Sequence, residues 1–357
     1  MVAKAIAKKL IENGIESTIQ PFGNNRANLV ARIKGTGHKK SLVFCGHMDT
    51  VSVGDISWEH DPFGAEEIDD LIYGRGASDM KGGLAALVIA MIEVFKSGIT
   101  LEGDLVLAAT AGEEVECIGA SIMVKDGVLN DAGAMVVAEP SGGEIFVTHK
   151  GALWLEIISY GKTAHGSMPE LGINAIENMN LFINTIHHRL KFKYEEDSLL
   201  GGPTINIATI SGGIQLNVVP DMCKLQIDIR TVPGQNHQEI LSDISLLISE
   251  IELSSNAKFD VKILNDKVAV KNKANDQFVQ LTLDTATEMF GSEYKAKGVR
   301  YCTDASIFVP GFNNELSVII CGPGEETQAH QPNEYIKTSK YIDAISLYKE
   351  IALRYLK

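Results

Sequence analysis

The sequence is poor in cysteine and in aromatic residues, and it contains no long apolar run. Aromatic residues make up 6% of its 357 residues. The longest strongly apolar run covers residues 84–92, whereas a membrane-spanning helix needs about 20 residues. The five cysteines, an odd number without a C-x-x-C pair, argue against a disulfide framework and against a structural zinc knuckle. We therefore expect a protein of the reducing cytoplasm.

Positive charge is also scarce. The 32 Lys and Arg residues are outnumbered by 46 Asp and Glu residues, so the formal net charge is −14. An acidic surface argues against binding to nucleic acid or to anionic membranes. Residues 1–16 contain lysines but no uninterrupted apolar core, and they predict an amphipathic helix rather than a signal peptide.

The remaining composition is that of a globular protein with a sizeable core, since 45% of the residues are apolar and 22% are charged. The length suggests two domains. Apolar runs without polar alternation predict strands covered on both faces, as in an α/β sheet, at residues 42–45, 105–109, 135–138 and 317–321. Helices are expected over residues 80–95 and from residue 339 onward.

A segment of different character begins near residue 153. Strands are predicted at residues 153–160, 205–210, 223–229 and 259–263, and helical stripes at 176–190 and 240–251. This β-α-β-β-α-β order is the ferredoxin-like unit. We therefore predict an inserted domain at residues 153–265 and an α/β domain made of residues 1–152 and 266–357.

Polar residues follow the first of the apolar strands. His47 and Asp49 stand two residues apart, so their side chains face the same way in extended chain. A metal-bound histidine usually donates its other ring N–H to a carboxylate, and Asp49 would be that carboxylate. The alternative interpretation is a polar strand end without function.

Acidic residues occupy two further turns. Asp79 lies in the glycine-rich segment GRGASDMKGG, which would present it where a strand is followed by a helix. The alternative is an ordinary helix N-cap. Glu113 and Glu114 follow the strand at 105–109, and they repel each other unless a cation is near. A metal bound by one, with its water held by the other, would resolve this repulsion. The alternative is an acidic surface loop.

Two more candidates complete a set of nitrogen and oxygen ligands. Glu139 ends the strand at 135–138, and His330 follows a Gly-Pro-Gly loop. A ligand set without thiolate suits zinc, cobalt or manganese. Ligands that share one carboxylate can hold two metals about 3.5–4 Å apart; the five candidates are His47, Asp79, Glu114, Glu139 and His330.

The ordered segments GHMDT, GRGASDMKGG, AGEE, AEPS and AHQPNE resemble the dinuclear zinc peptidase and deacylase family. This family includes acetylornithine deacetylase, succinyl-diaminopimelate desuccinylase, aminoacylase and carboxypeptidase G. The resemblance runs from about residue 20 to the C-terminus. It implies an α/β zinc-peptidase-like catalytic domain with an inserted ferredoxin-like lid that often dimerises. The family usually has a helix before the one predicted at Val2, which implies a shortened N-terminus.

The resemblance also implies a role for each metal-site residue. Asp79 would bridge two metal ions. One ion would also bind His47 and Glu139, and the other would bind Glu114 and His330.

Further roles follow from the same resemblance. Glu113 would be the general base, and Asp49 would support His47. His165, in the inserted domain, would reach the active site of a partner subunit and stabilise the oxyanion. Substrate contacts would come from Arg230, Asn217, Lys150 and Thr303. The segments 149–152 and 301–304 differ from those of the better-known desuccinylases, which leaves the acyl group open.

The sequence therefore predicts a cytoplasmic, zinc-dependent amide hydrolase of N-acyl amino acids that forms a homodimer through the lid. N-succinyl-diaminopimelate and N-acetylornithine are the leading substrates. A dipeptidase, a tripeptidase or a carboxypeptidase of the same fold is the alternative. A non-catalytic metal-binding protein is a more remote one, since a pocket that only binds does not need Glu113 beside Glu114.

Overall fold

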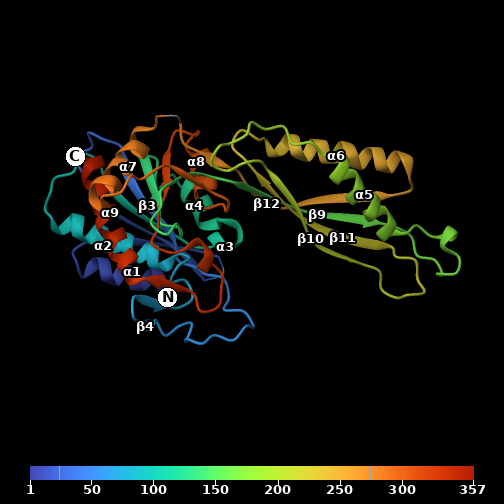
Figure 1. The fold of residues 1–357 in the computed structure, drawn as a ribbon, viewed down its shortest axis with the longest axis horizontal. Helices are drawn as coiled ribbons and strands as arrows, with labels where there is room; N and C mark the ends of the chain where they lie inside the picture. The colour runs from blue at the N-terminus through green and yellow to red at the C-terminus, as the bar shows by residue number, and fades with distance from the viewer. Residues whose placement is uncertain (24, 274) are drawn as a thin grey trace. The chain divides into compact units, whose positions relative to one another are not determined.

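The computed structural model describes residues 1–23, 25–273 and 275–357, and these residues form two compact units (Figure 1). The large unit consists of Met1–Thr148, Lys271–Val299 and Thr303–Lys357. The inserted unit consists of His149–Val270 together with Arg300–Cys302.

The large unit is built on a sheet with a parallel centre. Within the described residues this sheet has nine strands. Every residue of its central strands β3 and β6 is buried, which explains why their sequences are continuously apolar. The parallel neighbours, in spatial order, are β6 (Leu105–Thr110), β3 (Ser41–His47), β7 (Ala132–Val137) and β15 (Ser317–Ile320).

Shorter or antiparallel strands flank this centre. One edge is formed by β1 (Ser17–Phe22) and β2 (Arg26–Ile33). The other edge contains β8 (Phe146–His149), β13 (Val270–Lys271) and β14 (Lys297–Val299). A separate small sheet has the order β16 (Tyr335–Lys337), β5 (Leu71–Tyr73) and β4 (Glu67–Ile68). Turns of 3₁₀ helix occur at Pro169–Leu171 and Glu326–Gln328.

Helices cover the large sheet in two groups (Figure 1). One group comprises α1 (Val2–Ile11), α2 (Lys81–Lys96), α7 (Gln277–Phe290) and α9 (Thr338–Leu356). The other comprises α3 (Glu113–Glu116), α4 (Ile118–Lys125) and α8 (Ala305–Gly311). Helices α2 and α9 pack against each other and against β3. The buried Tyr348 of α9 packs beside Phe44, and its hydroxyl donates to the carbonyl oxygen of Cys321 at 2.6 Å.

The inserted unit is a four-stranded antiparallel sheet with two helices. The predicted β-α-β-β-α-β order is present as β9 (Gly151–Tyr160), α5 (Ala175–Arg189), β10 (Thr204–Gly212), β11 (Met222–Thr231), α6 (His237–Ser254) and β12 (Lys258–Lys267). The spatial order is β10-β11-β9-β12. Apolar residues on alternate positions of β11 and on the predicted helix stripes form its core. Side chains of Asn174 and Asn236 cap the two helices.

The end of strand β3 lies further along the chain than the sequence predicts. The apolar run at 42–45 predicts a strand that stops before Gly46, but β3 continues through His47. Gly46 stays in the sheet because it pairs with Ala109 of β6, and His47 pairs with Thr110. The glycine also leaves room for the Met80 side chain, which a Cβ at position 46 would contact at 2.9 Å.

Helix α2 packs closely against the end of β7, so we expect Gly83→Ala to lower the stability of the protein. A Cβ at Gly83 would overlap the carbonyl oxygen of Ala138, which is backbone and cannot move aside cheaply. We expect the free energy of unfolding to fall by about 1–3 kcal/mol. Gly23→Ala is the matched control because, apart from its chain neighbours, no described residue lies within 4 Å of its added Cβ. Urea unfolding of both variants checks this, and equal stabilities would contradict the packing argument.

Candidate metal centre

The predicted metal-site residues of the large unit meet at the carboxyl ends of its parallel strands. His47 is the last residue of β3, Glu113 and Glu114 open α3 after β6, and Glu139 follows β7 by two residues. Asp79 directly precedes the N-cap of α2, and its peptide bond to Met80 is cis. Neighbouring parallel strands end at the same edge of a sheet, which is where α/β proteins bind ligands.

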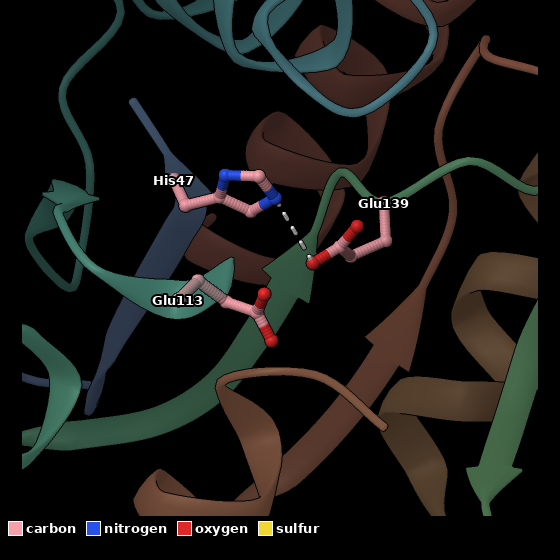
Figure 2. A group of neighbouring side chains, drawn as sticks. All are labelled: His47, Glu113 and Glu139. Carbon is pink, nitrogen blue, oxygen red and sulfur yellow. Dashed lines mark ion pairs between the residues drawn. The ribbon is translucent and has the colours of Figure 1, made fainter. Parts of the chain in front are cut away.

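His47 lies at the centre of one group of side chains. Its Nε2 is 3.2 Å from Oδ1 of Asp79 and 3.7 Å from Oε1 of Glu139. Figure 2 shows the side chains of His47, Glu113 and Glu139 converging, with His47 paired to Glu139. One ligand atom from each of these three residues lies within 4.8 Å of the others, and the same holds for His47, Asp79 and Glu114.

His330 approaches the same carboxylates from another loop. Its Nε2 is 3.3 Å from Oδ2 of Asp79 and 3.1 Å from Oε2 of Glu114. Asp79 therefore faces His47 with one oxygen and His330 with the other. This is the geometry that a carboxylate shared by two cations requires. The carboxylate does not cap α2, whose N-cap is Met80 and which has no side-chain cap hydrogen bond.

The electrostatics of the group favour a bound cation. Burial opposes the charge on Asp79, but hydrogen bonds from His330 and His47 outweigh it and hold the pKa of Asp79 well below its usual range. Burial raises the pKa of Glu139, and the nearby Asp79 carboxylate adds to the increase. Hydrogen bonds to Asp79 and Glu114 raise the pKa of His330 to about 10. A divalent cation would relieve this crowding of carboxylates, and the nitrogen and oxygen donors suit one.

Asp49 lies beside His47 with both its backbone and its side chain. The Nδ1 atom of His47 is 3.0 Å from the main-chain oxygen of Asp49, whereas the Asp49 carboxylate lies 3.8 Å away. That carboxylate instead accepts hydrogen bonds from the N–H of Gly112 at 2.7 Å and of Glu114 at 3.3 Å. Asp49 thus supports His47 mainly through its backbone, while its side chain holds the turn that carries Glu113 and Glu114.

Two buried acids were not assigned by sequence reasoning. Asp304 accepts a hydrogen bond from the Thr110 hydroxyl at 2.6 Å, and its carboxylate lies within 4.8 Å of ligand atoms of Glu113 and Cys117. Glu334 accepts hydrogen bonds from main-chain N–H groups of the loop that carries Asp79. Both acids lie in segments already noted in the sequence. The residues around an acid in the sequence do not show whether its side chain is buried or exposed, so neither acid was predicted to have a role.

The predicted residues of the inserted unit fall into two places. His165 and Asn217 lie on adjacent segments, since His165 forms an isolated bridge with Val218 and Gly166 donates to the Asn217 carbonyl at 2.8 Å. Both side chains belong to exposed residues. Arg230 sits opposite Ala152 in the sheet, and its Nε pairs with Asp228 at 2.9 Å.

Two predicted substrate contacts are buried. Lys150 donates to the carbonyl oxygen of Gly202 at 2.6 Å, and burial lowers its pKa. Thr303, in the large unit, is 0% exposed, and its hydroxyl accepts a hydrogen bond from the N–H of Ala305 at 3.1 Å. Both side chains have protein partners in this structure, and their roles as substrate contacts stay predictions.

Comparison with known proteins decides the family. Residues 43–354 match the model of peptidase family M20/M25/M40. The chain belongs to this family. The predicted family and the predicted class, a hydrolase of amide bonds, are therefore confirmed. None of the helices in the described part of the chain is both long and apolar enough to cross a membrane.

Members of the M20/M25/M40 family match the chain over most of its length. It is 35% identical to a "Probable succinyl-diaminopimelate desuccinylase" of Staphylococcus aureus (strain MRSA252), over 96% of this chain and 89% of that protein. It is 31% identical to an acetylornithine deacetylase of Proteus mirabilis, over 90% and 81% of the two chains. The fold is similar to that of an M20 family metallo-carboxypeptidase of Sulfolobus solfataricus, with a TM-score of 0.83 and 22% sequence identity. The similarity covers 99% of this chain and 93% of that chain.

The raised pKa of His330 predicts proton release when this family member takes up metal. With a pKa of about 10, His330 carries a proton at pH 7 in the metal-free protein, and a metal ligand must be neutral. Metal affinity should therefore rise as the pH increases from 7 toward 10. Titration calorimetry in buffers of different ionisation enthalpy measures the released protons. The variant His330→Asn should release fewer protons when it binds metal. Metal binding by the parent protein without proton release would contradict the assignment of His330 as a metal ligand.

Proposed function

We propose that this protein hydrolyses the amide bond of an N-acyl amino acid, in the manner of a succinyl-diaminopimelate desuccinylase or an acetylornithine deacetylase. The observation that carries the proposal is the position of Asp79 between His47 and His330, with the Glu113 carboxylate beside His47. The names of the similar proteins from S. aureus and P. mirabilis support this substrate class.

The side chains fit two divalent metal ions, which we propose to be zinc. His47, Asp79 and Glu139 would hold one ion. Asp79 would share the other with Glu114 and His330. When bound, such ions supply a water molecule of lowered pKa and polarise a carbonyl group.

Glu113 would move the proton in this reaction. Its buried carboxylate would take a proton from the attacking water and give it to the leaving nitrogen. The backbone of the Glu113–Glu114 turn is held by the Asp49 carboxylate, which fixes where both acids point. The two neighbours then diverge, because Glu114 contacts His330 while Glu113 lies in the group with His47 and Glu139.

Residues of the inserted unit would bind the substrate. The planar guanidinium of Arg230 can pair bidentately with a substrate carboxylate, and Lys150 and Asn217 would add polar contacts. Exposed His165, on the segment beside Asn217, would donate to the oxyanion. Its position on an exposed loop suits a contact to a second copy of the chain.

We also propose that the protein is a cytoplasmic homodimer joined through the inserted unit. Strand β10 lies at an edge of its sheet, so one row of its backbone groups can pair with another chain. Apolar side chains on and after this strand are exposed: Ile210 at 54%, Ile214 at 83% and Leu216 at 103%. The cysteines within the described residues form no disulfide, which suits a reducing compartment.

Replacing Glu113 by Gln tests the proposed reaction. The amide keeps the shape of the carboxylate but is not basic, so kcat for N-succinyl or N-acetyl amino acids should fall by at least about 100-fold while both metals stay bound. The zinc- or cobalt-loaded parent should hydrolyse these substrates faster than dipeptides. Near-normal kcat in the variant would exclude Glu113 as the base, loss of metal would make it a ligand, and faster dipeptide hydrolysis would favour a peptidase.

Mixed dimers test the contribution of His165. His165→Ala should lower kcat by about 10²–10³-fold with unchanged metal content, because an oxyanion donor is lost. If His165 acts across the dimer, mixing this variant with Glu113→Gln should restore activity, since one hybrid site keeps both residues. A verified heterodimer without recovered activity would place His165 within its own chain or outside the reaction.

A further inference from the structure

A single buried carboxylate, that of Glu334, holds the loop that carries Asp79. Glu334 is 0% exposed and lies four residues after His330. Its Oε1 accepts hydrogen bonds from the main-chain N–H groups of Ser78 at 2.8 Å and of Asp79 at 2.9 Å. Its Oε2 accepts from the N–H of Gly76 at 2.9 Å. Three main-chain donors of one loop thus converge on a side chain more than 250 residues away in the sequence.

Arg75 fills the remaining acceptor position of this carboxylate. Its Nη1 donates to Oε2 of Glu334 at 2.6 Å, and the pair is almost completely buried. Its Nη2 donates to the main-chain oxygen of His330 at 3.5 Å, and the guanidinium lies 5.0 Å from the centre of the Trp58 ring. Arg75 therefore contacts both the segment of Glu334 and the residue His330 itself.

Strand pairing brings the two loops together. Tyr335 of β16 pairs with Tyr73 of β5, so residues that follow β5 and residues that precede β16 leave the small sheet at the same end. The Ser78 hydroxyl adds a hydrogen bond to the Tyr335 carbonyl at 3.0 Å. Beyond the strands, the Glu334 carboxylate accepts a hydrogen bond directly from the Asp79 N–H.

We propose that Glu334 is a positioning residue of the metal site: held by Arg75, it fixes the Asp79 backbone relative to His330 and so sets the affinity for metal. With its N–H bound, Asp79 has little freedom beyond its own side-chain torsions, and Oδ2 stays 3.3 Å from Nε2 of His330.

The chemistry of the pair supports positioning rather than simple stabilisation. A carboxylate offers about four acceptor positions, and Glu334 uses four of them. A buried ion pair is often no more stabilising than apolar residues of the same volume, so stability alone does not explain its presence. An apolar pair would leave the donors of Gly76, Ser78 and Asp79 without these acceptors. The geometry of the loop depends on the carboxylate.

Metal affinity of Glu334→Gln tests the proposal, which rests on Asp79 and His330 being metal ligands as proposed above. The amide accepts at one position only, so the Glu334 side chain should lose either its Gly76 and Arg75 contacts or its Ser78 and Asp79 contacts. We expect affinity for at least one Co²⁺ ion to fall by about 10–100-fold and the visible Co²⁺ spectrum to change. Titration of the metal-free, folded protein with Co²⁺ measures both. A purely structural role would lower the unfolding midpoint and leave these two readouts unchanged, which would overturn the proposal.

Three further variants keep the test decisive. Glu325→Gln is the matched control, because Glu325 pairs with Lys337 at the surface and its side chain does not contact the Asp79 backbone. If Glu334→Gln does not fold, Arg75→Gln keeps the main-chain contacts of Glu334 and should weaken Co²⁺ binding about tenfold. Wild-type affinity in folded Arg75→Gln would then overturn the proposal. Asp79→Ala checks the ligand assignment separately: if it still binds two ions tightly, the proposed metal site is wrong, whatever Glu334 does.

Discussion

The large unit brings several carboxylates together at the carboxyl ends of β3, β6 and β7. The rest of the unit has to hold these like charges close to each other. The carboxylates of Asp79, Glu113, Glu114 and Glu139 converge there on the imidazoles of His47 and His330. Burial raises the pKa of Glu139, and the neighbouring Asp79 carboxylate adds to the increase. Bound divalent cations would remove this repulsion, so metal uptake and stability should be linked.

The protein holds these acids with main-chain hydrogen bonds from their own loops. Asp49 accepts N–H donors from the Glu113–Glu114 turn, and Glu334 accepts them from the Asp79 loop. Each acid binds the backbone next to a proposed ligand and leaves the ligand side chain directed into the site. Beneath the loops, β3 and β6 are buried along their whole length and α2 packs closely on the end of β7. The positions of the candidate ligands therefore depend on a rigid apolar layer and on a few buried carboxylates.

Local sequence patterns predicted most of the secondary structure because each pattern reports how a segment is buried. The continuous apolar run at 42–45 became β3, and the alternation at 223–229 became β11 with every second residue inside. Apolar residues three or four positions apart at 176–190 became α5. The end of β3 was misplaced because the pairing of Gly46 with Ala109 is a contact between distant segments.

The sequence by itself determined the types of candidate ligand, their order along the chain and the strand ends at which most of them occur, since these are local properties. Only the tertiary structure decided that each Asp79 oxygen faces a different histidine and that Asp49 supports His47 through a carbonyl. It also revealed Glu334, whose carboxylate binds a loop 255 residues away along the chain. Hydrogen bonds of this kind depend on which distant segments fold against each other. The spacing of residues within one segment does not predict these contacts.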